Sequence, residues 1–361
     1  MEQVLNDFIF TEYVVIGVST GPDSMCLLDL LQKKTNKIIV CHINHNIRKE
    51  SKKEQKFIEK YCKKNNLILE TMTIKKYEEN NFENEARKKR YKFYEETLKK
   101  YNSHTLLLAH HGDDLIETVL MKIIRGSNLE GYSGIKLINK KKDYQIIRPL
   151  LPYTKEDIIN YNIENSITYY IDKTNTDENY TRNRIRKNIL PLLKKEDINI
   201  HNKFIKYSNT LIEYDNYIKR QIEKIINTIY NDNTIDIIEL NKQDPFLIKN
   251  ILYYIMNTIY NNESNIITEK HINSILSLIK NNKPNISIDL PYNKKITKEY
   301  NKLIIENKES INTNYQIELK STIEISNLTI KKVENEEKDD NSVCRLNSKE
   351  QHPYDWSYRF R

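Results

Sequence analysis

The first segment that could bind a charged ligand is the short loop STGPDS at residues 19–24. It follows an apolar run at residues 13–16 and precedes a stretch with helical apolar spacing. A loop in this position presents unpaired backbone N–H groups to an anion, and its hydroxyl groups add further donors. Gly21 lets the backbone approach a ligand closely. These features predict a phosphate or pyrophosphate site formed by Ser19, Thr20, Gly21, Pro22, Asp23 and Ser24.

The acidic residue of this loop bears on the kind of phosphate chemistry. A Walker loop carries a lysine that grips the β- and γ-phosphates, whereas this loop carries Asp23. A carboxylate would repel a bare phosphate, but it can hold Mg²⁺, which prefers oxygen ligands and bridges phosphates. It would also suit a site that must release pyrophosphate. From the loop alone, a plain helix-capping role for Asp23 is equally consistent.

A second polar cluster lies in the segment AHHGDDLIET at residues 109–118. His110 ends an expected strand, and Asp113 and Asp114 open the helix that follows. Open α/β sheets bind ligands at the carboxyl ends of their strands, so His110 and Asp114 are expected to face one pocket. There His110 would orient or stabilise a nucleotide, and Asp113 or Asp114 would accept a proton; the sequence does not divide these roles. The alternative is that both aspartates only complement the helix dipole.

The elements expected around these residues alternate between strands and helices. Strands are expected at 14–18, 37–44, 67–74 and 105–110, with helices at 24–34, 51–65, 83–101 and 113–125. This alternation predicts an α/β domain with a parallel sheet covered on both faces. After Pro191, apolar residues recur at helical spacing over 203–229 and 247–281, and residues 281–307 suggest a turn and a short hairpin. We therefore expect a smaller, mainly helical second domain.

Composition narrows the class of protein without fixing its partner. Of 361 residues, 38% are hydrophobic and 30% are charged, and the net charge is +8, which is only weak support for a nucleic-acid partner. The four cysteines form no C-x-x-C pair, so neither a zinc site nor a disulfide framework is expected. The N-terminus does not resemble a signal peptide, and no run of about 20 apolar residues exists. A cytoplasmic protein without a membrane partner is expected, or a stromal one if the gene is organellar.

Several segments resemble those of a known enzyme family. The loop STGPDS resembles the S-G-G-x-D-S loop of the PP-loop ATP pyrophosphatases, which cleave ATP to AMP and pyrophosphate. Further segments, in the right order, resemble the tRNA(Ile)-lysidine synthases within that superfamily. They are VCHINHNIRKES (40–51), ENEARKKRYKFY (83–94), AHHGDDLIETVLMKIIRG (109–126), RPLLPYTKEDIINY (148–161) and DKTNTDENYTRNRIRKNILP (172–191). Together they cover about residues 14–191 and make the resemblance specific, whereas the helical stretch beyond them is less similar.

The resemblance implies a reaction. ATP, with Mg²⁺ bound by Asp23 and Asp114, would adenylate C2 of the wobble cytidine, cytidine 34, of an isoleucine tRNA with a CAU anticodon. The ε-amine of free L-lysine would then displace AMP. The product, lysidine, pairs with A instead of G and changes the tRNA from a methionine to an isoleucine acceptor. The implied partners are therefore this tRNA and lysine, and a homodimer is left open.

The resemblance also implies roles for residues outside the two clusters. His45 and Arg87 would lie near the nucleotide. Glu117 would either receive the lysine substrate or pair with a cation on its own helix, such as Lys122 or Arg125. Basic residues are commonly just solvated, but here they suit RNA phosphate or a clamp on the base. The expected lysine- and tRNA-binding residues are Glu117, Arg125, Arg182, Arg184 and Arg186.

The chain departs from the family pattern in three places. Thr20 stands where the family has the first glycine of its loop; if that position needs a positive φ, a β-branched residue costs roughly 1–2 kcal/mol. Asn44 replaces an aspartate, so any carboxylate role there is lost. Residues 312–361 can hold only part of the family's C-terminal domain. We expect a catalytic domain at 1–195, a helical, tRNA-contacting domain at 196–311, and a linker with a partial C-terminal region at 312–361.

Two alternatives belong to other classes of function. Another PP-loop tRNA enzyme, such as a thiolation enzyme, would need catalytic or cluster-binding cysteines, and no C-x-x-C is present. A non-catalytic tRNA- or nucleotide-binding relative is supported only by the departures at Thr20 and Asn44. Retained, tRNA-dependent ATP cleavage would exclude the second alternative.

Overall fold

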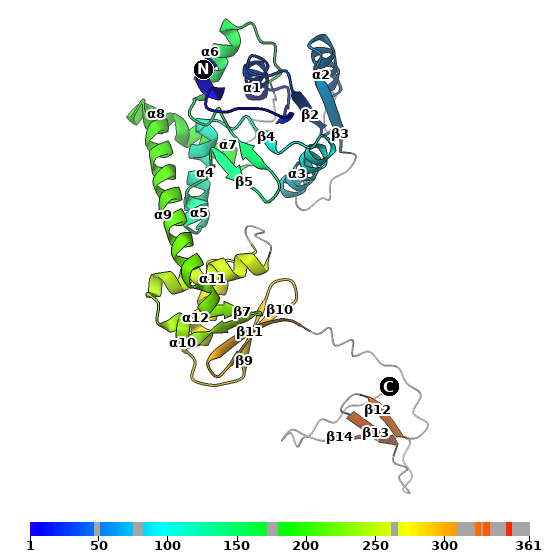
Figure 1. Cartoon of the computed structure of the whole chain (residues 1–361), viewed down its shortest axis with the longest axis vertical. Coiled ribbons are helices and arrows are strands. Elements are labelled where there is room, and N and C mark those ends of the chain that lie inside the picture. The colour runs from blue at the N-terminus through cyan, green and yellow to red at the C-terminus, as the bar shows by residue number, and fades with distance from the viewer. Residues whose placement is uncertain are drawn as a thin grey trace. The chain divides into compact units, whose positions relative to one another are not determined.

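The computed structural model describes residues 1–46, 51–74, 82–171, 180–260 and 266–308, together with three strands further along the chain (Figure 1). One compact unit spans Met1–Glu306 and a second spans Asn307–Arg361. The described part of the second unit is an antiparallel sheet of β12 (Thr322–Ile325), β13 (Leu328–Lys332) and β14 (Cys344–Ser348). The rest of the expected C-terminal region at 312–361 lies outside the described residues.

A six-stranded sheet forms the centre of the N-terminal half of the first unit. After a short 3₁₀ turn at Glu2–Leu5, the strands are β1 (Val14–Gly17), β2 (Ile38–Asn44), β3 (Ile68–Thr73), β4 (Thr105–Leu107), β5 (Ile138–Lys140) and β6 (Gln145–Ile147). Their order is β3-β2-β1-β4-β6-β5, and all pairs are parallel except β5 with β6. The expected parallel sheet is confirmed. Because the strand order reverses between β1 and β4, the loops after these two strands meet at one edge of the sheet.

Helices cover both faces of this sheet (Figure 1). On one face α1 (Pro22–Gln32), α2 (Ser51–Lys64) and α6 (Lys155–Glu164) bury Leu27, Ile58 and Ile158 against β1 and β2. On the other face α3 (Phe82–Lys100) packs against Val15 and its neighbours. Neighbouring residues of each strand point to opposite faces of the sheet. Because helices bury both faces, the residues on both sides are apolar, and each strand is a continuous apolar run in the sequence.

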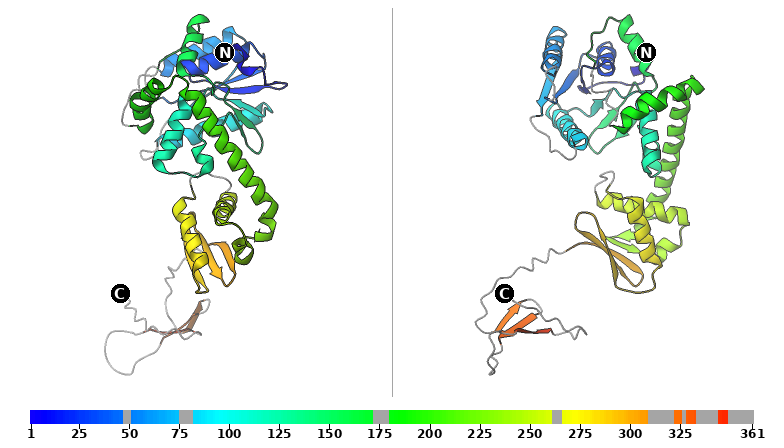
Figure 2. Two further views of the ribbon diagram at one scale, coloured as in Figure 1. Left: turned by 90° about the vertical axis from the view of Figure 1, so that its left-hand side faces the viewer. Right: turned by 180° about the vertical axis from the view of Figure 1, so that it is seen from behind.

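A group of helices follows the fourth strand and lies beside the sheet (Figure 2). The elements are α4 (Gly112–Arg125), α5 (Leu129–Tyr132), α7 (Thr181–Arg184), a π-helical turn at Ile185–Ile189, α8 (Leu190–Glu196) and the 30-residue α9 (Ile200–Ile229). Along α9 every seventh residue is buried: His201, Ser208, Asp215, Ile222 and Ile229. His201 faces α4 and Ser208 faces the end of α5. Ile222 and Ile229 belong to the hydrophobic core of the C-terminal half.

The C-terminal half of the first unit combines helices with a second sheet. The helices are α10 (Ile237–Asn241), α11 (Pro245–Ile259) and α12 (Glu269–Lys280). The strands are β7 (Tyr230–Asn231), β8 (Thr234–Asp236), β9 (Ile286–Leu290), β10 (Lys294–Glu299) and β11 (Lys302–Asn307), in the order β7-β8-β11-β10-β9. This half is mainly helical, as expected, and the hairpin expected at 281–307 belongs to this larger sheet. β7 and β8 were not expected from the sequence, because strands of two and three residues are too short to show alternation.

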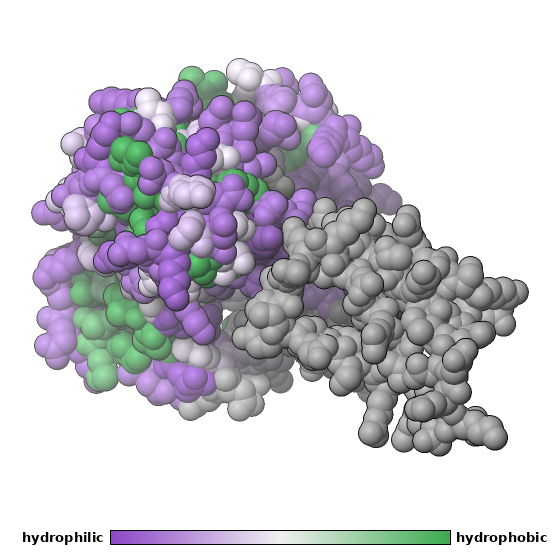
Figure 3. Space-filling view, turned by 90° about the horizontal axis from the view of Figure 1, so that it is seen from below, coloured by the Kyte–Doolittle hydropathy of each residue, from purple (hydrophilic) through white to green (hydrophobic). Residues whose placement is uncertain are grey.

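On the coloured part of the face seen from below, hydrophilic residues predominate and hydrophobic residues form smaller areas among them (Figure 3). Within the described part of the chain, no helix combines the length and hydropathy needed to cross a bilayer.

Candidate functional site

The loop between β1 and α1 is closed by its own hydroxyl groups. The Ser19 N–H donates to the Ser24 Oγ over 3.1 Å, and the Ser24 Oγ donates to the Gly21 carbonyl over 3.1 Å. Gly21 is the N-cap of α1, and it has no side chain with which to cap this helix end. Unpaired N–H groups at a helix N-terminus can bind an anion, so the geometry fits the phosphate site expected at residues 19–24.

Thr20 has the backbone conformation that favours glycine. Its φ is +66°, and the residue is fully buried. Its Oγ1 has no hydrogen-bond partner among the described residues, while its carbonyl accepts the Tyr170 N–H over 2.9 Å. The condition for a strained threonine is therefore met, at a cost of about 1–2 kcal/mol.

Asp23 and Asp114 come together at the edge of the sheet. The Nε2 of His111 lies 3.8 Å from the Asp23 Oδ1 and 3.6 Å from the Asp114 Oδ2. The His111 N–H also donates to the Asp114 Oδ2 over 3.1 Å, which fixes this carboxylate at the start of α4. Asp23 is not the cap of α1; instead, Lys155 on α6 contacts its Oδ1 at 2.5 Å. Neither His111 nor Lys155 was among the site residues expected from the sequence, although both lie in the family-like segments at 109–126 and 148–161.

His110 lies beside this pair with its ring largely enclosed. Its Nδ1 is buried and lacks a hydrogen-bond partner in the described part of the chain. Burial lowers its pKa, and the charges of Arg148, Arg182 and Arg87 lower it further, whereas Asp114 opposes them. The imidazole is therefore neutral at pH 7. A neutral ring can exchange hydrogen bonds with a ligand without adding charge to the site.

Glu117 forms the centre of a buried charge cluster one turn further along α4. The carboxylate is fully buried, and Arg186 binds it through two contacts, Nε to Oε1 at 2.6 Å and Nη2 to Oε2 at 3.0 Å. The Arg182 Nε lies 3.1 Å from Oε2. Burial raises the pKa of Glu117, and the two arginines oppose that shift. Glu117 thus pairs with Arg182 and Arg186, rather than with a cation on its own helix.

The same cluster continues to the carboxylate pair. The Arg186 Nη2 lies 3.4 Å from the Asp114 Oδ1, and the Arg182 Nη2 donates to the Thr118 Oγ1 over 2.9 Å. Burial alone would raise the pKa of Asp114, but His111, His110 and Arg182 hold it below its usual range. Asp114 is therefore ionised and surrounded by positive or polar groups.

Three of the expected site residues lie apart from this cluster. Arg184 is exposed and donates to the Thr181 Oγ1 over 3.1 Å. Arg125 is exposed at the last turn of α4, roughly 16 Å along the helix from Asp114 at 1.5 Å per residue. Asp113 is buried on another side of α4, where the His201 Nε2 contacts its Oδ1 at 2.5 Å and the Lys194 Nζ contacts its Oδ2 at 3.1 Å.

The two remaining expected residues lie at the margin. Arg87 is exposed on α3, with its guanidinium 4.9 Å from the centre of the Tyr91 ring, and it is close enough to affect His110. His45 is half-buried just after the end of β2. Asn44, which replaces the family's aspartate, binds Gln55 at 2.7 Å and accepts the Asn46 N–H at 2.8 Å, so it closes the turn after β2.

The carboxylates permit a magnesium site that is completed by substrate. Among the described residues, no group of three or more His, Cys, Asp or Glu could hold a metal ion by itself. Mg²⁺ in nucleotide enzymes commonly has one or two protein carboxylates, with phosphate and water as the other ligands. Asp23 and Asp114, both within 4 Å of the same His111 nitrogen and next to the phosphate loop, fit that arrangement.

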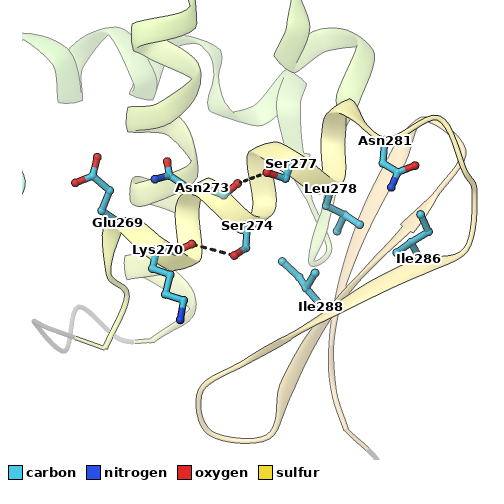
Figure 4. Close-up of a pocket in the computed structure, with 9 residues that line it drawn as sticks. All are labelled: Glu269, Lys270, Asn273, Ser274, Ser277, Leu278, Asn281, Ile286 and Ile288. Carbon is cyan, nitrogen blue, oxygen red and sulfur yellow. Dashed lines mark hydrogen bonds between the residues drawn. The ribbon is translucent and has the colours of Figure 1, made fainter.

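Two hollows of the first unit lie away from this cluster. One, of about 680 Å³, opens between α12 and β9 and is lined by polar residues such as Lys270 and Asn273, with Leu278 and Ile288 (Figure 4). A second, of about 180 Å³, lies between α5, α9 and α11. Neither contains a residue of the two clusters, and the candidate site is identified by its chemistry.

The comparisons with known proteins agree with this location. The PP-loop domain family matches residues 1–193, which contain both clusters. The tRNA(Ile)-lysidine synthase of Bacillus thuringiensis subsp. konkukian is 36% identical over 339 residues, covering 87% of this chain and 70% of that protein. The chain belongs to the tRNA(Ile)-lysidine synthase family.

Two further matches define how far this relationship extends. The tRNA(Ile)-lysidine synthase of Bacillus subtilis is 33% identical over 301 residues, and the chain spans 64% of its length. The solved U34-tRNA thiolase NcsA of Methanococcus maripaludis has a TM-score of 0.50 at 16% identity, over 58% of this chain and 76% of that one. That likeness shows the shared PP-loop fold. Within the tRNA(Ile)-lysidine synthase family, the region around Asp23, His110 and Asp114 is the candidate active site of this chain.

Proposed function

We propose that this chain joins lysine to C2 of cytidine 34 in a tRNA(Ile) with a CAU anticodon, consuming ATP and releasing AMP and pyrophosphate. The observation that carries the proposal is the meeting of Asp23 and Asp114 at His111, beside an anion-binding loop, in a chain of this family. An ATP molecule with its phosphates at residues 19–24 would have its α-phosphate near both carboxylates.

The first step would be adenylation of the base. The O2 atom of the cytidine attacks the α-phosphorus, the bond to the β-phosphate breaks, and pyrophosphate leaves. Bound Mg²⁺, held by Asp23 and Asp114, would neutralise charge on the triphosphate. The backbone N–H groups at the start of α1 would hold the leaving pyrophosphate. Neutral His110 would donate or accept a hydrogen bond to the nucleotide, and this orientation is the main contribution that a phosphoryl-transfer site makes.

The second step would be attack by lysine. The ε-ammonium loses a proton, its nitrogen forms a bond to C2, and the bond from C2 to the AMP oxygen breaks. Ionised Asp114 would attract the ammonium, and water would carry the proton away. We propose that Glu117 acts by positioning Arg182 and Arg186, because both arginines contact its carboxylate. Their remaining N–H groups would then bind the lysine carboxylate or an RNA phosphate.

We also propose a surface for the tRNA on the exposed side of α9. Tyr207, Tyr214 and Tyr217 are 41%, 59% and 56% exposed, and the exposed Lys206 and Lys224 lie before and after them along the helix. At 100° per residue these five residues lie within one arc of roughly 100° on α9, away from its buried heptad positions. Aromatic rings stack on unpaired bases and lysines contact phosphates. This pattern supports the expected tRNA-contacting role of the segment after residue 196.

The thiolation alternative is opposed by the described cysteines. Cys26, Cys41 and Cys62 are all buried, and burial raises the pKa of each thiol to about 12. Sulfur transfer uses thiolates, which such cysteines do not form at pH 7. The side chain of Cys344 lies outside the described residues.

The test is transfer of labelled lysine to tRNA. The purified chain is incubated with ATP, Mg²⁺ and lysine, either with tRNA(Ile) bearing a CAU anticodon or with a methionine tRNA that has the same anticodon. We expect transfer only to the first tRNA, and loss of transfer in the Asp23→Ala variant. AMP formation without lysine transfer would point to another nucleophile. Absence of ATP cleavage with either tRNA would refute the proposal.

A further inference from the structure

A buried contact joins the candidate active site to an element beyond the PP-loop match. That match ends at residue 193, whereas His201 lies in the first turn of α9. The His201 Nε2 contacts the Asp113 Oδ1 at 2.5 Å, and the two side chains are 6% and 8% exposed. Asp113 stands directly before Asp114 on α4, so this contact holds the turn that carries the candidate catalytic carboxylate.

The His201 ring also packs against the backbone of that turn. A Cβ atom added to Gly112 would lie 2.8 Å from the His201 Cδ2 and 3.0 Å from the Tyr153 carbonyl oxygen. The Gly112 N–H donates to this same carbonyl over 2.8 Å. Only glycine leaves room for the ring here, so the first turn of α4 is fixed from two sides at a residue next to His111.

The chemistry of the contact is defined by the charges around it. Burial alone would raise the pKa of Asp113, but the hydrogen bond from His201 and the charge of Lys194 hold it below its usual range. An ionised carboxylate can only accept, so His201 donates through Nε2. Lys194, on α8, supplies the second contact at 3.1 Å and also lies 3.4 Å from Glu156 on α6. Each oxygen of Asp113 therefore has a side-chain partner, one from α9 and one from α8.

We propose that His201 is a positioning residue of the active site, which through Asp113 and Gly112 fixes the first turn of α4 and with it His111 and Asp114. The catalytic centre then depends on α9, an element outside the matched PP-loop domain. Asp113, one of two aspartates between which the sequence could not choose, has the same positioning role. This inference rests on the proposed function for its effect on catalysis, but not for its effect on α4.

The test compares substitutions that separate the hydrogen bond from packing. His201→Phe keeps a ring against Gly112 and removes the donor, whereas His201→Gln restores a donor nitrogen at similar reach. Ser208→Ala is the matched control, because Ser208 is the buried residue one heptad after His201 on α9. The substitution removes another buried hydrogen bond, from the Ser208 Oγ to the Ser133 carbonyl at 2.6 Å, that does not involve the first turn of α4. Lysine transfer and hydrogen–deuterium exchange of residues 109–118 are measured on the full chain.

We expect His201→Phe to lower kcat by about 10- to 100-fold with the KM for ATP nearly unchanged, because a small displacement of reacting groups has effects of this size. His201→Gln should recover most of the activity, and Ser208→Ala should leave kcat unchanged. In an Asp113→Ala background, His201→Phe should add little, since the contact is already lost. Exchange at 109–118 should rise in His201→Phe and not in Ser208→Ala.

Other results would overturn the inference. If kcat per folded molecule and exchange at 109–118 are the same in His201→Phe as in the wild type, His201 does not position α4. If His201→Phe and Ser208→Ala lower activity equally, the role of His201 is only general stability. If the wild type transfers no lysine, the proposed function fails, yet the exchange experiment still decides whether His201 fixes the turn.

Discussion

At the scale of single residues, the active-site loop contains a conflict between side chain and backbone. Thr20 is β-branched and fully buried at a φ of +66°, a region that glycine occupies without cost. The Tyr170 N–H, at 2.9 Å from the Thr20 carbonyl, is one of the contacts that hold this conformation. The loop shape is therefore maintained by the surrounding structure against a local preference, as is common at functional sites.

Replacing this threonine with glycine should stabilise the protein. Thr20→Gly removes a strain of about 1–2 kcal/mol, while the added freedom of glycine in the unfolded chain costs about 0.5–1 kcal/mol. We expect a net gain of up to about 1.5 kcal/mol in the free energy of unfolding, measured by urea denaturation. Thr11→Gly, at an exposed position without positive φ, is the control and should give no gain. Destabilisation by Thr20→Gly would show that the side-chain packing outweighs the strain.

A second prediction concerns the buried His42 beneath the same loop. Burial lowers its pKa, although its hydrogen bond to the Val18 carbonyl at 2.9 Å and the charge of Glu59 oppose this. The unfolded state binds a proton near pH 6.5 and the native state only at lower pH. Stability from His42 is therefore present above pH 6.5 and falls as the pH decreases below it, by at most about 1.4 kcal/mol per unit.

The measurement is the free energy of unfolding at pH 7 and pH 5. The wild type should lose more stability over this interval than His42→Gln, which cannot take up the proton. The control is His104→Gln, at an exposed histidine paired with Glu12. This variant should lose as much stability between pH 7 and pH 5 as the wild type. Equal losses in the wild type and His42→Gln would show that His42 is not kept neutral by the fold.

At the scale of elements, the sheet and its loops could be predicted, but the contacts between distant helices could not. The alternation of strands and helices predicted the parallel sheet and placed His110 at the carboxyl end of a strand, and in the structure Asp23 and Asp114 lie near the same His111 nitrogen. Residues 182–186 carried the signal of a basic cluster within a family-like segment. Their orientation depends on the π-helical turn at Ile185–Ile189 and on the packing of α4, which no local pattern encodes. His201 gave no signal either, because its partner lies 88 residues earlier.

The basic cluster yields a prediction at this scale. Arg186 binds Glu117 through two nitrogens, a geometry that lysine cannot reproduce. Arg184, two residues earlier, is exposed and donates to Thr181. We expect Arg186→Lys to lower kcat/KM for lysine transfer by at least about 10-fold, an effect of about 1.4 kcal/mol, and Arg184→Lys to change it by less than about 2-fold. Similar losses in both variants would mean that the cluster binds RNA directly through both arginines.

At the scale of the whole molecule, α9 connects the two halves of the first unit. Its buried heptad positions contact α4 and α5 near one end and enter the second hydrophobic core at the other. The sequence predicted the helix from its apolar spacing, but a structure was needed to show that its first buried residue reaches the active site. A tRNA bound along α9 would therefore lie on the same rigid element that positions the candidate catalytic turn.

The exposed side of α9 gives the prediction that tests this arrangement. Replacing Tyr207, Tyr214 and Tyr217 with serine should weaken tRNA binding by about 10-fold or more, because one stacked base contributes about 1–3 kcal/mol. The control is the pair Tyr292→Ser and Tyr300→Ser, which are 71% and 76% exposed in the C-terminal half. Affinity is measured by fluorescence anisotropy at one fixed salt concentration, since phosphate contacts make it salt-dependent.

The lysines of the same face should act differently from the tyrosines. Lys206→Gln and Lys224→Gln should each reduce the slope of log affinity against log salt by about 1, if each lysine contacts one phosphate. The tyrosine variants should leave that slope unchanged, because stacking releases no counterions. If the tyrosine and control variants bind tRNA equally well, and the slope is unaffected by both lysines, the tRNA does not contact this face of α9. The tRNA-binding surface would then have to be sought on other elements of the chain.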